Sequence, residues 1–225
     1  MTNLKFFLQK LFFLLVMGFN FNSMFASGNK EADKVNNHEY VDLGLSVKWA
    51  TCNVGADSPE DYGDYYAWGE ITTKSDFSWI TYKWCKRTND TMTKYCTDSK
   101  CGTVDNRTIL TSSDDVATVK WGSKWRMPTI EEISELCDCT WTWTSQNGVK
   151  GMKVTGPNGK SIFLPAAGAR SGTSLYNCGK YGYYWSTTLD DIVNDYAYYL
   201  LFKDGLCTSN YWSRGYGCTN RPVTE

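Results

Sequence analysis

The part of the chain that most constrains the fold is the C-terminal stretch, residues 162–223. It consists of short apolar and aromatic runs separated by glycine-rich turns, in the order IFLPAAGARSG, YGYYWSTT, YAYYLLFKDG and RGYGCTNRPV. Runs of this length and composition, bounded by turn residues, are typical of strands. Almost none of their side chains perform acid–base or nucleophilic chemistry. The stretch therefore predicts a rigid frame that displays side chains rather than a catalytic centre.

The first residues predict export. A weakly basic start, MTNLKFFLQK, precedes the apolar run LFFLLVMGF, which is the pattern of a secretory signal peptide. The run is shorter than the about 20 apolar residues that span a bilayer. We expect a signal peptide over residues 1–27, cleaved near Ala26 or Ser27; an uncleaved N-terminal anchor is the alternative. The folded part is expected to be secreted or at the cell surface, with no membrane-spanning segment after signal cleavage.

Composition narrows the class of protein. The formal net charge is −1 and no stripe of Lys and Arg occurs, so neither nucleic acid nor an anionic membrane is an expected partner. An aromatic fraction of 16% with 19 glycines favours a β-rich, loop-rich globular domain over disorder. We expect a flexible lead-in over residues 28–37 and a single domain over residues 38–225, with a polar insertion near residues 71–110.

Two helices are predicted. Thr129 and Glu132 have the spacing of a capping box, and apolar residues follow them at helical spacing. These residues are Ile130, Ile133, Leu136 and Cys137. A weaker helix is predicted to start near Ser112 or Ser113 and to end at Gly122.

Strands are predicted over residues 140–144 and 149–155. The turn residues 156–159, GPNG, lead into the apolar run SIFLP, which is the strongest hairpin signal in the chain. The sequence thus predicts an α+β fold with two helices, mostly antiparallel β-structure and many loops.

The cysteine pattern leaves the pairing open. The nine cysteines are Cys52, Cys85, Cys96, Cys101, Cys137, Cys139, Cys178, Cys207 and Cys218. An exported chain can oxidise them, but an odd number leaves at least one unpaired in a monomer. A local bridge is most expected among the three cysteines of the insertion. Cys137 and Cys139 are too close to pair easily with each other, so each would pair elsewhere. The alternative is that several are small buried hydrophobic residues.

Candidate catalytic and metal-binding groups are few. His38 is the only histidine and no pair of CxxC motifs occurs, which argues against zinc and against a Ser–His–Asp arrangement. Asp190 and Asp191 lie in a loop without hydrophobic surroundings, so we interpret them as solvated charges rather than as glycosidase carboxylates. We expect no catalytic residues, no metal and no cofactor.

A candidate binding face follows from the run YAYYLLFKDG. Because side chains alternate along a strand, one side is expected to face the core and the other to face outward. The expected outward residues are Ala197, Tyr199, Leu201 and Lys203, and the polar segment after them adds Asn210, Tyr211, Trp212 and Tyr216. Aromatic rings beside short polar groups are a common composition for a binding surface. The alternative is that these aromatic residues only pack the rim of the domain.

Several segments together resemble a known family. In order and spacing they are similar to the Fibrobacter succinogenes major paralogous domain, which has a C-type-lectin-like fold. It is related to formylglycine-generating sulfatase-modifying enzymes and to variable proteins diversified by retroelements. The segments are WRMPT at 125–129, FLPAAGAR at 163–170, YGYYWSTT at 181–188, AYYLLF at 197–202 and NRPV at 220–223. The resemblance covers about residues 38–223.

The resemblance implies roles for individual positions. The implied scaffold positions are Trp125, Arg126, Pro128, Pro165, Ala166, Gly168, Arg170, Trp185, Ser186, Arg221, Pro222 and Val223. The positions that match the variable, ligand-contacting region of the diversified relatives are Tyr199, Leu201, Leu206, Asn210, Tyr211, Ser213 and Tyr216.

The chain also departs from these relatives. The Glu-Pro-Asn, Gln-Pro-Asp and Trp-Asn-Asp motifs of calcium-dependent lectins do not occur. Cys207 and Cys218 lie late in the chain, but the residues around them do not match the motif that binds copper in the oxidase relatives.

The sequence therefore predicts a secreted or surface-displayed module that binds an extracellular protein or glycan and is not an enzyme. The alternatives are a copper or cysteine oxidase and a passive structural domain of a surface assembly.

Overall fold

The computed structural model describes residues 33–190 and 192–225. The predicted signal peptide and the first part of the predicted lead-in lie outside these residues. Within the two described ranges, no helix is long and apolar enough to cross a membrane.

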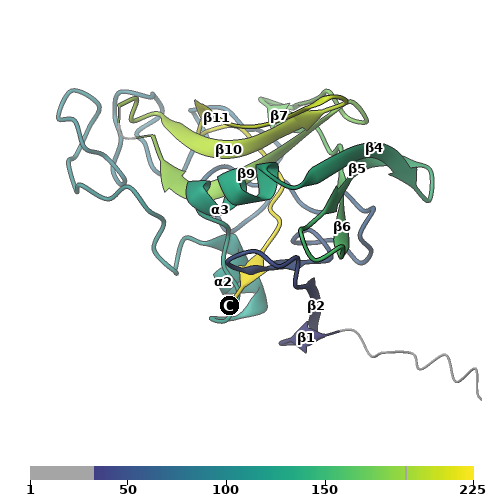
Figure 1. The fold of residues 1–225 in the computed structure, drawn as a ribbon. Helices are drawn as coiled ribbons and strands as arrows, with labels where there is room; N and C mark the ends of the chain where they lie inside the picture. Colours follow the sequence, from purple (N-terminus) through teal and green to yellow (C-terminus); the bar gives the residue numbers. More distant parts are fainter. Residues whose placement is uncertain (1–32, 191) are drawn as a thin grey trace, which may run out of the picture. The chain divides into compact units, whose positions relative to one another are not determined.

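The described residues form a mostly-β fold, with 38% of them in strand or bridge positions and 7% in helix. The prediction of an α+β, C-type-lectin-like fold is therefore wrong. Its two helices exist, but they are α2 (Val116–Trp121) and α3 (Ile130–Cys137), of six and eight residues. The other described residues form loops and turns, and the sheets supply the layers of the fold (Figure 1).

The two helices differ in how well their ends were predicted. The capping box of α3 is confirmed, because the Thr129 hydroxyl accepts a hydrogen bond from the Glu132 amide and the Glu132 carboxylate accepts one from the Thr129 amide. The first helix starts later than predicted. Asp115 has extended backbone angles and its carboxylate caps the Thr118 amide, so the helix begins after Asp115 rather than near Ser112.

Within residues 33–190 and 192–225, the strands form four antiparallel sheets. The first has the order β1 (Lys34–Val35), β2 (His38–Val41), β3 (Lys48–Ala50) and β12 (Val223–Thr224). The second has the order β11 (Leu206–Ser213), β10 (Tyr196–Lys203) and β9 (Tyr181–Leu189). The third has the order β4 (Thr140–Gln146), β5 (Val149–Thr155) and β6 (Ser161–Pro165), and the fourth pairs β7 (Ala169–Ser171) with β8 (Ser174–Tyr176). The predicted strands at 140–144 and 149–155 and the hairpin into SIFLP are confirmed.

The sheet β9–β10–β11 separates two hydrophobic clusters. The first cluster includes Trp68, Trp125 and Trp185, together with Ala197 and Tyr199 of β10. The second cluster includes Leu43, Trp49 and Leu164, the α3 residues Ile133 and Leu136, and Leu200 and Phe202 of β10. Alternate side chains of β10 therefore enter different clusters, so that this strand is covered on both faces along part of its length.

One glycine makes the packing of this sheet possible. Gly182 of β9 lies opposite Phe202 in the register. A Cβ atom at Gly182 would lie 2.1 Å from Cζ of the buried Phe202 ring, which is far closer than two carbon atoms approach without contact strain. The absence of a side chain at Gly182 therefore creates the space that the phenylalanine ring fills.

The C-terminal segment, residues 213–224, connects the sheets. In Figure 1 it is the yellow chain that runs from the end of β11 past α2 to the C-terminus. Cys218 exchanges two backbone hydrogen bonds with Tyr66, at 3.0 and 3.1 Å. Thr219 donates to the Tyr183 carbonyl and accepts from the Trp185 amide. The segment thus pairs with loops and strands that are far apart in the sequence.

Arg221 in this segment is a buried cation that pairs with no carboxylate of the described residues. Its guanidinium donates to the carbonyls of Ala50 and Thr51 at 3.0 and 2.8 Å and to Oδ1 of Asn53 at 2.8 Å. The side chain is 1% exposed, and burial lowers its pKa. Its hydrogen bonds connect the C-terminal segment to the loop after β3.

The side chain of Arg214 connects the C-terminal segment to the polar insertion, again by hydrogen bonds to backbone carbonyls. It is fully buried and donates to the carbonyls of Tyr95 and Lys94 at 2.7 and 3.0 Å. Its guanidinium also lies 5.8 and 5.5 Å from the ring centroids of Trp68 and Tyr82. The predicted insertion near 71–110 forms only isolated bridges, so side-chain contacts such as these hold it in place.

We expect Arg221→Ala to lower the free energy of unfolding by about 3 kcal/mol or more, because three buried acceptors would lose their donors. Guanidinium denaturation monitored by tryptophan fluorescence measures this loss. Arg107→Ala is the matched control, since Arg107 is exposed, and we expect its effect to stay within about 0.5 kcal/mol. Equal stability of the two variants would contradict the role given to Arg221.

Candidate ligand-binding face

The register of the central sheet brings most of the predicted binding residues onto one face. Residues paired directly across two antiparallel strands point to the same side of a sheet. On this face, the paired residues of β10 and β11 are Ala197 and Trp212, Tyr199 and Asn210, Leu201 and Thr208, and Lys203 and Leu206. Strand β9 adds Tyr181 opposite Lys203 and Tyr183 opposite Leu201.

The accessible part of this side is a patch that we call the aromatic face. It consists of Tyr181, Leu201, Lys203, Leu206, Thr208, Asn210, Trp212 and Tyr216, all half-buried or exposed. The rings of Trp212 and Tyr216 meet edge to face with centroids 4.5 Å apart. Nζ of Lys203 lies 5.6 Å from the Tyr181 ring centroid. These contacts hold rings, one cation and short polar groups side by side.

Tyr199 does not belong to the accessible patch, so its prediction as an outward residue is wrong. It is 5% exposed, and its ring packs against the rings of Tyr183, Trp185 and Trp212 with centroids 5.8 to 6.0 Å apart. The alternation of β10 was assigned correctly, but the first hydrophobic cluster covers the Ala197 end of the face. Tyr199 instead supports Trp212 from below, and burial raises the pKa of its hydroxyl.

Tyr211 and Ser213 lie on the other side of the same sheet. The register pairs them with Tyr198 and Tyr196, and the Tyr211 ring contacts the rings of both these tyrosines at centroid distances of 6.0 Å. Tyr211 is 49% exposed, whereas Ser213 is buried, so Ser213 does not belong to an accessible surface in the structure. Neither residue can share a ligand with Trp212 through the aromatic face.

Sequence reasoning missed the contribution of β9. Tyr183 is buried beneath the face and stacks with Tyr181 at a centroid distance of 5.9 Å. The amide of Asn177 donates to the Tyr183 hydroxyl at 2.9 Å, and burial raises the pKa of that hydroxyl. The alternation in YGYYWSTT places Tyr181, Tyr183 and Trp185 on one side, and this signal was sufficient to find them.

The two late cysteines, Cys207 and Cys218, belong to different hydrophobic clusters. Cys207 packs against the second hydrophobic cluster and Cys218 is buried in the first. Burial raises the pKa of the Cys218 thiol, which disfavours the nucleophilic thiolate. Across the described residues, no group of three His, Cys, Asp or Glu side chains is arranged to hold a metal ion. All nine cysteines have free thiols in the structure.

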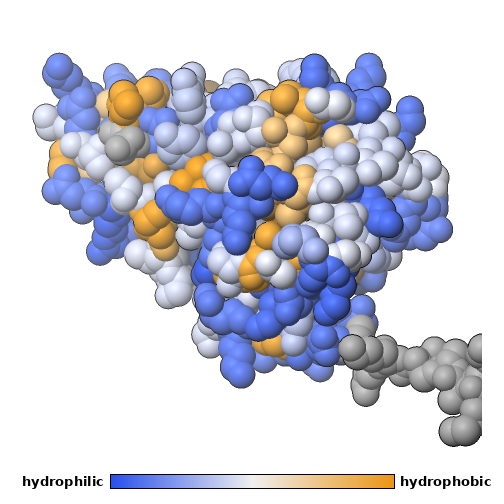
Figure 2. Space-filling model, in the orientation of Figure 1, coloured by the Kyte–Doolittle hydropathy of each residue, from blue (hydrophilic) through white to orange (hydrophobic). Residues whose placement is uncertain are grey.

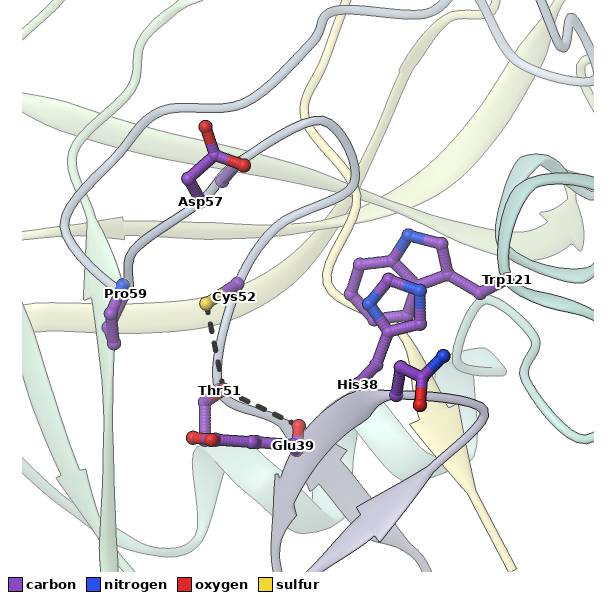
Figure 3. A pocket seen from close by; sticks show the side chains of 9 residues that line it. His38, Glu39, Thr51, Cys52, Asp57, Pro59 and Trp121 are labelled. Carbon is purple, nitrogen blue, oxygen red and sulfur yellow. Dashed lines mark hydrogen bonds between the residues drawn. The ribbon is translucent and has the colours of Figure 1, made fainter. Parts of the chain in front are cut away.

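A separate hollow, of about 310 Å³, lies beside β2 and α2 (Figure 3). Its lining residues are Asn37, His38, Glu39, Thr51, Cys52, Ala56, Asp57, Pro59 and Trp121. The imidazole of His38 stacks on the Trp121 ring with centroids 3.7 Å apart and an interplanar angle of 7°. Figure 3 shows these rings on one side of the hollow and Asp57 and Pro59 on the other. No pattern in the sequence predicted this hollow, because its lining comes from segments far apart in the chain.

On the face of the molecule seen in Figure 2, hydrophobic side chains are scattered. Figure 2, which has α3 in front, shows a hydrophobic strip broken by hydrophilic side chains rather than one continuous patch. The aromatic face is thus distinguished by its ring contacts and polar neighbours rather than by bulk hydrophobicity.

Comparisons of the chain with protein-family models, with curated proteins and with solved structures find no match. The resemblance to the Fibrobacter succinogenes major paralogous domain therefore stays a prediction from the sequence motifs.

We expect His38 to titrate below its ordinary pKa of 6.5, because burial in the hollow disfavours the imidazolium. Since the native pKa lies below the unfolded one, the unfolded chain binds more protons in this range. Stability should therefore fall as the pH drops from about 7 through 6.5 towards the native pKa. His38 is the only histidine, so one NMR imidazole resonance reports the midpoint.

Trp121→Ala is the comparison variant for this measurement. It removes the stacked ring, and the midpoint should return towards 6.5. A native midpoint at or above 6.5 in the unaltered chain would contradict the burial argument.

Proposed function

We propose that the chain is an exported, non-catalytic module that binds an extracellular protein or glycan through its aromatic face. The observation that supports this most directly is the pair Trp212 and Tyr216. Their rings are in contact, both are half-buried, and Asn210 and Thr208 on the same strand supply short polar groups beside them. Rings of this kind offer large contact area, and the polar groups orient the ligand by hydrogen bonds.

The support beneath the face favours binding over passive packing. Trp212 rests on Tyr199 and Tyr183, whose rings lie 6.0 and 5.3 Å from it between centroids. Both tyrosines belong to the first hydrophobic cluster. A ring held in place before the ligand arrives loses little conformational entropy on binding.

The charge of the face favours a neutral or anionic ligand. Lys203 is the only charged residue among the eight that form the face, and its Nζ sits near the Tyr181 ring. Hydroxyl-rich sugars and the polar rim of a protein both fit rings, amides and hydroxyls. Export rests on the N-terminal sequence pattern, which lies outside the described residues.

The experiment is a binding screen of the full chain on a glycan array and an array of extracellular proteins, followed by titration of the strongest hit. We expect Trp212→Ala and Tyr216→Ala each to raise the Kd by about tenfold, the loss of roughly 1.4 kcal/mol that one aromatic contact and its burial supply. The array that gives the hit separates the two ligand classes.

Tyr211→Ala is the matched control, because it removes an exposed ring from the other side of the same strand. It should bind as the unaltered chain does. Equal binding by the Trp212→Ala chain, with unchanged thermal unfolding, would exclude the aromatic face as the site. An unaltered chain that binds nothing on either array would favour a passive structural domain.

A further inference from the structure

A second hollow, of about 380 Å³, lies where β7 meets the polar insertion. Its lining joins Arg170 of β7 with residues that lie before and within the insertion. The backbone of Arg170 exchanges two hydrogen bonds with Gly217, at 2.8 and 2.9 Å, and Phe77 exchanges two with Gly172, at 2.8 and 3.1 Å. Backbone hydrogen bonds therefore hold the walls in place, and the volume lies within the about 300–1,000 Å³ of small-molecule pockets.

The guanidinium of Arg170 has no anionic partner among the described residues. It lies 5.0 Å from the centroid of the Tyr65 ring, and that ring is itself held because its hydroxyl donates to the Ala167 carbonyl. The Arg170 side chain is half-buried, yet it makes no hydrogen bond or ion pair within residues 33–190 and 192–225. A guanidinium has five N–H donors, so this one can bind an acceptor that enters the hollow.

Lys74, the other cation of the lining, is already neutralised. Its Nζ lies 2.9 Å from Oε1 of Glu70, which is 5% exposed, and it also donates to the Thr81 carbonyl at 3.2 Å. Arg170 is thus the group in this hollow whose positive charge is left for a ligand.

The remaining polar groups of the hollow fit a ligand that carries hydroxyls. The Asp64 carboxylate accepts a hydrogen bond from the Tyr66 hydroxyl at 3.0 Å, and a carboxylate has room for further donors. Thr73 and Ser75 are exposed and add hydroxyls that can donate and accept. Because Asp64 repels negative charge, the hollow favours a ligand with a single anionic group over a multiply charged one.

We propose that this hollow binds a carboxylated sugar unit, a uronic acid. The sugar carboxylate pairs with Arg170, whose planar fork matches it through two parallel N–H···O bonds. The sugar hydroxyls donate to Asp64. No residue of the aromatic face lines the hollow, so the inference is independent of the ligand that the face binds.

The test is an NMR titration of the full chain, labelled with nitrogen-15, with glucuronate. We expect saturable shifts of the amide resonances of Arg170, Thr73 and Ser75. Glucose lacks the carboxylate and acetate lacks the hydroxyls, so each should bind at least about tenfold more weakly. Arg170→Gln should raise the Kd for glucuronate by about tenfold or more, because it removes the charge-assisted hydrogen bonds.

Arg107→Gln is the matched control, because Arg107 is an exposed arginine outside the hollow, and it should bind glucuronate as the unaltered chain does. The positions of the shifted amides in the unaltered chain decide the proposal even where the Arg170→Gln chain does not fold. Four results would each overturn it: no saturable binding, equal binding of glucose and glucuronate, shifts confined to the aromatic face, or an unchanged Kd in a folded Arg170→Gln chain.

Discussion

The fold depends on satisfying the backbone of one buried segment. Residues 213–224 run through the interior, where every amide and carbonyl without a partner costs free energy. Their partners come from widely separated parts of the chain: Tyr66 and Trp68 before the insertion, Arg170 after β6, Tyr183 and Trp185 in β9, and Arg126 before α3. The side chains of Arg214 and Arg221 add bonds to further carbonyls. Because so many segments share this one partner, none of them can take its position independently of the others.

This constraint also decides which part of the central sheet stays accessible. The segment pairs with β9 at Tyr183 and Trp185, and the first hydrophobic cluster closes over that end of the face. Tyr199 lies under the cover, whereas Leu201 lies two residues further along β10 and remains half-buried. The aromatic face is therefore the accessible end of one side of the sheet, and the other end of that side belongs to the hydrophobic core. Burial of Tyr199 does not remove the aromatic face; it gives Trp212 a rigid base.

The features that sequence could predict are those set by neighbouring residues. The capping box at Thr129 and the turn at residues 156–159 depend on side chains a few positions apart, and both were found. The alternation of β10 was also readable, and it grouped Leu201 with Lys203 as the register does. The alternation of side chains along a strand does not show whether another layer of the structure buries each face. The predicted exposure of Tyr199 was wrong for this reason, because distant segments supply the layer that covers it. The predicted α+β fold class was wrong because the two helices are short and the layers are sheets from distant parts of the chain.

Strand β11 raises a separate physical question, because it is an edge of its sheet. Among the described residues no strand pairs with its outer side, and an edge strand with a free ladder is both mobile and open to unwanted pairing. Packing against α3 holds one side of β11. A binding surface built on an edge strand needs such support, because rings that moved with the strand would lose the entropic advantage of a preformed face.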